Sequence, residues 1–550
     1  MKKEVFVALL LFHWMLSSAC AQDAWFTLKD ANLQTMPGTH FVFEDQVSWL
    51  LKGCPQGNLA MDALRIADGT SLVVDSQTAL CVNGQLQNPG GIDGLILQSD
   101  ATGSASFIHH DNGVYASIQR HIPAVDDWHA SPATDWRMIS TPVDGQEIAG
   151  FIPCEGHGDF DFYGWSEEEQ MWKNYKQYED FLAFNDGPDF NPGQGYLVAY
   201  EESQDFVFQG RMAVEDVWCN NLTHSWEEPY GGWHLLGNPY AAAIDWNNPA
   251  WDRPEVLDEV HVWHPESGNY ISNLNGIGDF DGIIRPHQAM FIKTNGPNKN
   301  ASLQFPAEAR MHAPGDFFRK TRQLPFNTLR LEVRAADDSA RDAAYISFAD
   351  DADPAFDPRY DAHHLQGAAH APGIYTRKME RKLSIAGFDP SDQTTVPLWF
   401  NPGDAQQYTL NVAGVETTLT DKDLFLKDLH TGYQYDLRKQ PEISFVAADM
   451  AGEPRFVLIP SDEDIVVDDP CTGGRESIII YSHKQHIHIT LPAGQSGEAR
   501  LLSADGRIQD HLLLPHDGPH VWHTRLPGGV YVVEVTTGEE LKREKVIISK

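Results

Sequence analysis

Few residues of this 550-residue sequence stand at spacings that could do chemistry. The nearest approach to a serine-hydrolase motif, Gly494-Gln495-Ser496-Gly497, stops one residue short of Gly-x-Ser-x-Gly. His483, His486 and His488 place two rings on one face of an expected strand, which leaves a metal there as a disfavoured alternative. The sequence contains no His-Glu-x-x-His zinc motif, no phosphate loop and no dinucleotide fingerprint. We therefore predict no catalytic, cofactor-binding or metal-binding residue, although 78 acidic residues leave a carboxylate pair for glycoside hydrolysis open.

Acidic turns are the one pattern that suits a cation. Residues 158–161, 186–189 and 278–282 each combine Asp with Gly, and Ca²⁺ prefers several such oxygens. None of the three stretches has the twelve-residue EF-hand loop with its closing Glu. Calcium stays an alternative, and exposed turns on an acidic protein are the favoured interpretation.

Tryptophan is concentrated between residues 123 and 313, where its rings could stack on sugars or fill cores. Four of the rings recur in a duplicated pattern described below, and recurrence favours packing; these are Trp136, Trp165, Trp233 and Trp263. Three other rings have no evident counterpart, which makes them better candidates for binding; these are Trp172, Trp226 and Trp251.

The segments that carry these rings occur as two similar copies in the sequence. Residues 136–142 and 233–239 share a Trp, an apolar pair, a small residue, a polar residue and a Pro. Later landmarks follow at offsets between 94 and 98 residues, such as residues 190–198 and 284–292. Self-similarity of this length predicts a duplicated β-rich unit, with copies at residues 123–218 and 219–313. We expect Trp136 and Trp233 to occupy equivalent buried positions.

The N-terminus indicates export. Lys2 and Lys3 precede an apolar run and an Ala-Cys-Ala end, which predicts a signal peptide over residues 1–21. A lipid on Cys20 is the alternative. No later apolar run is long enough to cross a membrane as a helix, so no transmembrane segment is expected in the mature chain. In an oxidising compartment Cys54 and Cys81, which lie in one small domain, are the expected disulfide.

The remaining segments predict an all-β, multidomain chain. Closely spaced short strands favour a β-solenoid over a small sandwich for residues 22–122, with strands near 63–66, 72–74, 80–82, 95–97 and 107–108. Residues 325–460 predict an antiparallel β-sandwich, with strands at 328–333, 344–348, 382–385, 396–400, 408–412, 424–429 and 455–459. An acidic linker at 461–475 leads to a last domain at 476–550.

Charge excludes one class of partner. The formal net charge is −38, so a nucleic acid would approach against a strongly negative field. We expect no nucleic-acid partner. The acidic surface is typical of a secreted protein that must stay soluble.

The last domain resembles a known sorting module. Residues 499–508 read as a strand, an Asp-Gly turn and a strand, and 526–535 give a second strand that begins after Gly. Residues 545–548 end the series. Their order and position resemble the Ig-like, Por-type C-terminal sorting domain of type IX secretion substrates in Bacteroidetes. The resemblance makes Gly506, Gly529, Tyr531 and Lys545 the expected sorting-signal residues, with the doubled Gly528-Gly529 as a departure.

This resemblance implies a compartment and a partner. We expect a secreted or cell-surface protein that meets the type IX secretion machinery at the outer membrane. The favoured function is non-catalytic, as a binding (adhesin-like) or scaffold protein whose partners are glycans or other surface proteins. The alternative is a secreted polysaccharide-active hydrolase, or its carbohydrate-binding component.

Overall fold

A computed structural model describes the chain from Ala24 onwards with gaps. The described residues are 24–27, 40–43, 48–52 and 58–548, without 126–127, 129–134, 228–229, 298–299, 314–323, 393–394, 449, 451, 462–477, 484–485, 492–493, 504–505, 517, 525, 528 and 539–540. Their regular secondary structure is almost entirely β-strand, and the single α-helix among them, α2, has four residues (Phe181–Phe184). The all-β prediction is confirmed.

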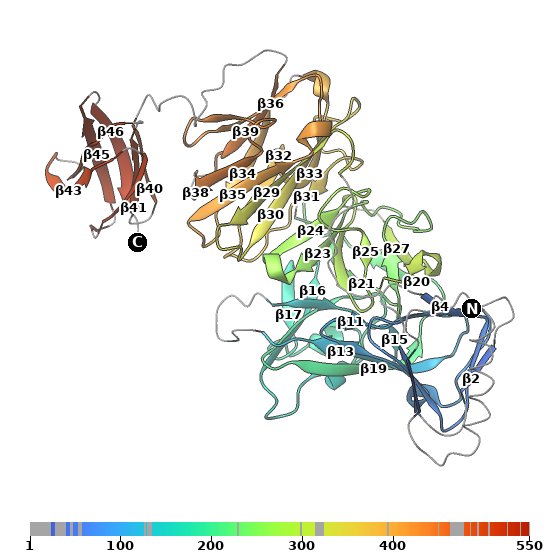
Figure 1. The fold of residues 1–550 in the computed structure, drawn as a ribbon. Coiled ribbons are helices and arrows are strands. Elements are labelled where there is room, and N and C mark those ends of the chain that lie inside the picture. Colours follow the sequence, from blue (N-terminus) through green and yellow to red (C-terminus); the bar gives the residue numbers. More distant parts are fainter. Residues whose placement is uncertain are drawn as a thin grey trace. The chain divides into compact units, whose positions relative to one another are not determined.

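The chain divides into two compact units. The first comprises residues 1–265 and 270–322, and the second comprises residues 266–269 and 323–550. Each is described below by itself, and both are visible in Figure 1.

The first unit begins as a β-solenoid. Short strands from successive turns of the chain stack in parallel on three faces, as the sequence predicted. One face holds β1 (Ala24–Thr27), β3 (Ser48–Lys52), β6 (Ser71–Val74), β9 (Leu95–Leu97) and β13 (Tyr115–Ile122). The second holds β2 (His40–Phe43), β5 (Ala63–Ile66) and β8 (Leu86–Gln87). The third holds β4 (Asn58–Met61), β7 (Ala79–Val82) and β12 (Ser106–Ile108).

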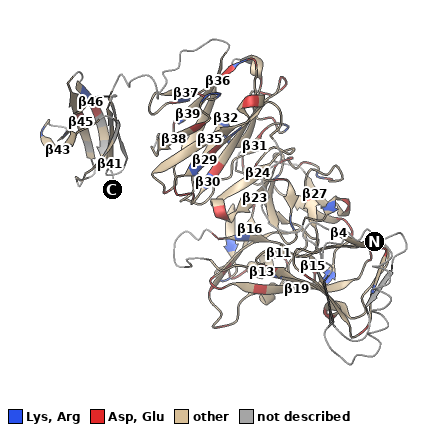
Figure 2. Ribbon diagram, in the orientation of Figure 1, with Lys and Arg blue, Asp and Glu red and all other residues tan. Residues whose placement is uncertain are grey.

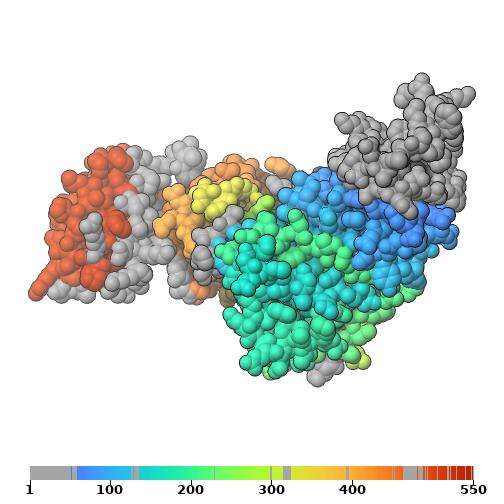
Figure 3. Space-filling model, turned by 90° about the horizontal axis from the view of Figure 1, so that it is seen from below, coloured from blue at the N-terminus to red at the C-terminus, as the bar shows by residue number. Residues whose placement is uncertain are grey.

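The solenoid does not end in a separate domain at residue 122. Strand β13 pairs along its whole length with β19 (Gln204–Met212), which belongs to the first copy of the duplicated unit. A single hydrophobic core runs from Leu51 in the solenoid to Phe208 in that copy. In Figure 3 the blue solenoid accordingly continues into the cyan and green segments. Residue 122 lies inside this continuous core. Because β13 pairs with β19, which follows much later in the sequence, the two segments share one core.

The two copies have the same sheet. In the first, the order is β14 (Arg137–Ile139), β18 (Tyr196–Tyr200), β16 (Phe160–Ser166), β17 (Met171–Asn174). In the second, it is β21 (Trp233–Gly237), β26 (Ala289–Lys293), β23 (Val260–His264), β24 (Asn269–Asn273). The register also repeats: Met138 opposes Leu197 as Leu235 opposes Phe291, and Tyr163 opposes Leu197 as His261 opposes Phe291. The predicted duplication is confirmed.

The copies contact each other through equivalent residues. Ile139 bridges Gln288 of the second copy, and its counterpart Leu236 bridges Gln194 of the first. The next residues repeat the exchange, because Ser140 N donates to His287 O at 3.2 Å and Gly237 N donates to Gly193 O at 2.9 Å. His287 and Gly193 both have positive φ, +59° and +88°, so the backbone conformation at this contact is duplicated as well. The reciprocity is that of a two-fold, isologous interface inside one chain.

In the second unit, all seven predicted strands between residues 328 and 459 are present. They are β29 (Thr328–Ala335), β30 (Arg341–Phe348), β33 (Arg381–Phe388), β34 (Val396–Asn401), β35 (Gln407–Ala413), β36 (Asp423–Asp428) and β39 (Phe456–Ser461). Four further strands are β31 (Ala362–His363), β32 (Gly373–Lys378), β37 (Gln434–Asp436) and β38 (Glu442–Val446). All eleven belong to one curled sheet around one core, and β30 pairs with β33 in parallel. The wholly antiparallel pairing of the prediction is corrected at that one pair.

The last domain has two sheets. One contains β40 (Ile479–His483), β41 (His486–Leu491) and β44 (Gly518–His523). The other contains β43 (Ile508–Leu514), β42 (Gly497–Ser503), β45 (Gly529–Thr537) and β46 (Leu541–Ile548). Its buried core draws only on residues between Ile478 and Ile548, so the domain has a core of its own.

Candidate functional site

The expected sorting-signal residues gather at one end of a sheet in the last domain. Gly506 forms the turn between β42 and β43, with φ +81° and its N–H donated to Ser503 O at 2.8 Å. Ser503 pairs with Tyr531, and Gly529 pairs with Ile548 at the end of β46. Tyr531 also donates its hydroxyl to Pro527 O at 3.0 Å. Three of the four positions thus lie at the same end of this sheet's strands.

Lys545, the fourth position, pairs with Val532 one step further along β46. Its backbone therefore adjoins the same end of the sheet, while its side chain lies outside the described residues. The turn at Gly506 favours glycine, because residues with a side chain rarely adopt a backbone φ of +81°.

The cysteine pair is only half described. Cys81 lies half-buried on β7, with its sulfur 3.1 Å from Asn83 Oδ1. Cys54 lies outside the described residues, so the disulfide stays a prediction. The signal peptide, Cys20 and residues 462–475 of the acidic linker also lie outside them, as do the side chains of His483, His486 and His488.

A hydrogen-bonded row of Ser, His and Glu lies in the second copy. Ser272 Oγ is 2.7 Å from His261 Nδ1, and His261 Nε2 is 3.1 Å from Glu259 Oε2. The residue types are those of a hydrolase triad, but Ser272 is 7%, His261 0% and Glu259 1% exposed. A substrate carbonyl cannot reach a serine at that depth, so the row fixes β23 to β24 rather than catalysing. The row forms no sequence motif, because Glu259 stands just before β23, His261 lies on β23, and Ser272 lies on β24.

Two of the three acidic turns, 158–161 and 278–282, are paired with basic side chains. Asp159 and Asp161 both contact Lys176 Nζ, at 2.9 and 3.4 Å, and Asp281 pairs with Arg285 at 3.0 Å. Within the described part of the chain, no three His, Cys, Asp or Glu side chains are grouped so that they could hold a metal ion.

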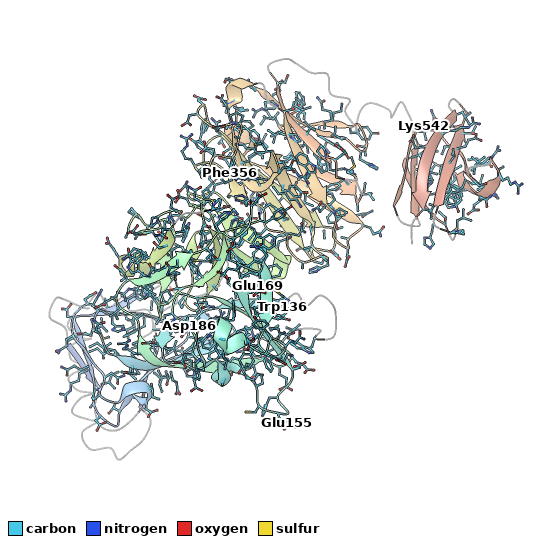
Figure 4. The ribbon with its side chains drawn as sticks, turned by 180° about the vertical axis from the view of Figure 1, so that it is seen from behind. Trp136, Glu155, Glu169, Asp186, Phe356 and Lys542 are labelled. Carbon is cyan, nitrogen blue, oxygen red and sulfur yellow. The ribbon has the colours of Figure 1, made fainter. Side chains whose placement is uncertain are left out.

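Aromatic side chains follow the β16–β17 hairpin. Trp136 meets Tyr163 edge to face at 5.5 Å between ring centroids, and Tyr163 meets Trp172 at 6.4 Å. Trp136, which Figure 4 labels, enters from the start of the first copy. Trp128 hydrogen-bonds to the Asp159 carboxylate just before β16, and Trp226 donates its indole N–H to Glu168 O just after it, at 3.0 Å. We call these five rings the aromatic row: Trp128, Trp136, Tyr163, Trp172 and Trp226.

No member of the aromatic row is buried. The first four are partly exposed, and Trp226 is 48% exposed. Trp136 therefore differs from its counterpart Trp233, which is 8% exposed, so the prediction that both rings are buried is correct for Trp233 and wrong for Trp136. The physical reason is the neighbourhood: Trp233 packs against His261 and Phe291, whereas Trp136 has Tyr163. Trp251, proposed for binding, is instead buried against Trp246 and Phe305.

The loop that carries Trp226 is held by a buried carboxylate. Glu167, 4% exposed at the β16–β17 turn, accepts four hydrogen bonds from this loop. They come from Thr223 Oγ1 at 2.6 Å and from Ser225 N, Ser225 Oγ and Gly232 N, each at 2.8 Å. Burial raises the pKa of Glu167, but the hydrogen bonds from Thr223, Gly232 and Ser225 outweigh burial and lower it to about 2.

Sequence comparison of the copies overlooked Trp128. It precedes Trp136 as Trp226 precedes Trp233, but the spacing differs by one residue, which hides the correspondence. Trp226 thus has a counterpart in the first copy, Trp128, contrary to the expectation that it has none. Because neither ring of this pair is buried, the recurrence is not explained by packing.

A second candidate is an open groove of about 830 Å³ in the first unit. Tyr115, which is 47% exposed, lines the groove with four glycines, and the lining residues Arg211 and Asp144, opposed on neighbouring strands, form an ion pair at 2.5 Å. The complete lining is Gly90, Gly91, Ile92, Tyr115, Asp144, Gly145, Gln209, Gly210 and Arg211. The Arg211–Asp144 pair leaves the groove without an uncompensated charge, so it offers shape and one aromatic ring rather than acid–base chemistry.

Charge is distributed rather than concentrated. Figure 2 shows basic residues (blue) and acidic residues (red) as separate short segments along the sheets of both units. In the part of the chain that the structure describes, no helix is long and apolar enough to cross a membrane.

Comparison with known proteins places the chain in a family. No curated protein matches it. A family model described as a domain of unknown function, DUF8693, matches residues 54–459, which cover the solenoid from β4 onwards, both copies and nearly all of the curled sheet. Since this match covers well over half of the chain, the protein belongs to the DUF8693 family.

Proposed function

We propose that the chain is an exported, non-catalytic β-protein of the cell surface or the exterior, which acts by binding (adhesin-like) or as a scaffold. Its last domain delivers it through the type IX secretion machinery at the outer membrane. The observation that carries this proposal is the gathering of Gly506, Tyr531 and Gly529 at one end of a sheet in a domain with its own core. A sorting signal read by a receptor needs such an autonomous, presentable module.

Binding is favoured over catalysis by the depth of the acid–base groups. The Ser272–His261–Glu259 row is closed off from solvent, whereas aromatic rings are presented to it. Rings at the surface with polar edges are typical of recognition sites. A polysaccharide-active hydrolase is the alternative, and it would need two carboxyl groups that flank the scissile bond of a bound sugar chain.

Removing residues 476–550 tests the export route. The cores of the solenoid, the two copies and the curled sheet contain no residue of the tail, so the shortened chain is expected to fold. We expect it to accumulate, folded and protease-resistant, in the periplasm of a host with type IX secretion, while the full chain reaches the outside. Immunoblots of periplasm, cell surface and medium measure this. Equal amounts of both chains outside the cell would refute the sorting role.

A further inference from the structure

The aromatic row is built as a presented surface. Trp226 is fixed by its own indole N–H to Glu168 O and by the loop that Glu167 anchors. Tyr230, in the same loop, is 69% exposed. Burying a carboxylate costs free energy, yet here a buried carboxylate holds a loop whose large side chains face solvent. Such preorganisation lowers the entropy that a ligand must overcome on binding.

The aromatic row follows strand β16. Asp161, Tyr163 and Trp165 share one face of β16, Trp128 is held just before the strand and Trp226 just after it. Seven residues of strand span about 23 Å at roughly 3.3 Å per residue. Rings spread over that length suit an extended ligand rather than a single small molecule.

The polar groups along the row define the ligand's chemistry. Carboxylates accompany the rings: Asp161, which accepts a hydrogen bond from Asn174 at 2.9 Å, shares a face of β16 with Tyr163, and Glu168 and Glu169 are exposed at the turn. Lys176 and Lys173 are already paired with Asp159 and Glu169. The row thus offers apolar faces and hydrogen-bond acceptors without an unpaired cation among these residues. A polyanion is disfavoured here, as it is by the net charge of −38.

We propose that the aromatic row binds a neutral polysaccharide, whose pyranose rings present C–H faces to the tryptophans and hydroxyl groups to the carboxylates. This gives the binding role proposed above a ligand class. It does not depend on the export route, because the purified chain binds or fails to bind without being exported.

Affinity electrophoresis of the purified full-length chain tests the proposal. The probes are neutral xylan, mannan and β-glucan, with alginate and polygalacturonate as acidic counterparts. We expect at least one neutral polysaccharide, and neither acidic one, to retard the chain. Trp226→Ala should weaken that retardation at least tenfold. Longer oligosaccharides of the same sugar should bind more tightly than short ones, up to the length of the row.

Trp218→Ala is the matched control, because Trp218 is 42% exposed on β20 (Val217–Leu222), paired with Gln304 in another sheet. Its retardation should equal that of the parent. The proposal is overturned if no neutral polysaccharide retards the parent, if only the acidic ones do, or if Trp218→Ala and Trp226→Ala weaken binding equally. The proposal is also overturned if Trp226→Ala leaves polysaccharide binding unchanged and weakens only binding to another protein. Loss of binding with normal export would leave the sorting role standing.

Discussion

Trp233→Ala is expected to lower the local free energy of unfolding of the second copy by about 3–5 kcal/mol, as for other buried tryptophans. Trp233 is 8% exposed, meets the His261 ring at 5.3 Å and the Phe291 ring at 6.5 Å, and lies 5.0 Å from Lys293 Nζ. Its backbone carbonyl accepts the Trp165 indole N–H at 2.8 Å, so a shift of β21 also reaches the first copy. Hydrogen exchange read by mass spectrometry measures this region separately from the other domains.

Trp136→Ala is the matched variant, because it removes the counterpart ring from a half-buried position. We expect a cost of about 1–2 kcal/mol, in proportion to the smaller area buried. Exchange in β21 and β26 that is unchanged by Trp233→Ala would contradict the packing role of that ring. Equal costs in both copies would contradict the difference in burial.

Glu167→Gln is expected to release the Trp226 loop at a cost of about 2 kcal/mol, since hydrogen bonds to a charged acceptor are lost. An amide presents one acceptor where the carboxylate presents two, and the four donors of the loop use both. The effect depends on pH in a defined direction. Because the folded pKa of about 2 lies below that of an unfolded Glu, about 4.3, the stabilisation is complete above that value and is lost as the pH falls towards 2.

Exchange of residues 222–233, compared at equal pH, checks this prediction. The parent should lose protection there between about pH 4.5 and 2, whereas Glu167→Gln should start lower and change little over the same range. Glu168→Gln is the control, because that side chain is exposed and only its backbone carbonyl binds the loop. If hydrogen-exchange protection of the loop in the parent protein does not change over this pH range, the anchoring role of Glu167 is contradicted.

Local patterns predicted the strands well, because a strand is specified by a few neighbouring residues. The solenoid strand at Ala63–Ile66 and the alternating strand that became β29 were both expected. The pairing of β13 with β19 was not expected, because it joins residues about ninety apart and no local pattern encodes the partner. The same limit applies to the parallel pair of β30 and β33 inside an otherwise antiparallel sheet.

For the candidate site, recurrence was a good guide to the fold and a poor guide to exposure. It predicted the shared sheet, but it could not separate Trp233, which has a ring on either side, from Trp136, which has one. Lack of a counterpart did not mean exposure either, because Trp251 fills a gap beside Trp246. Glu167 gave no signal in the sequence: its role depends on donors more than fifty residues away.

The location of the full-length chain in its native cells tests the central claim most directly. Intact cells are treated with protease, and the chain is followed by antibodies to residues 58–265 and by mass analysis of its N-terminus. We predict a chain that starts at Gln22 and is found in the medium or digested on intact cells. A chain that keeps Met1 and stays protected until the cells are lysed would contradict the claim that this is an exported binding protein.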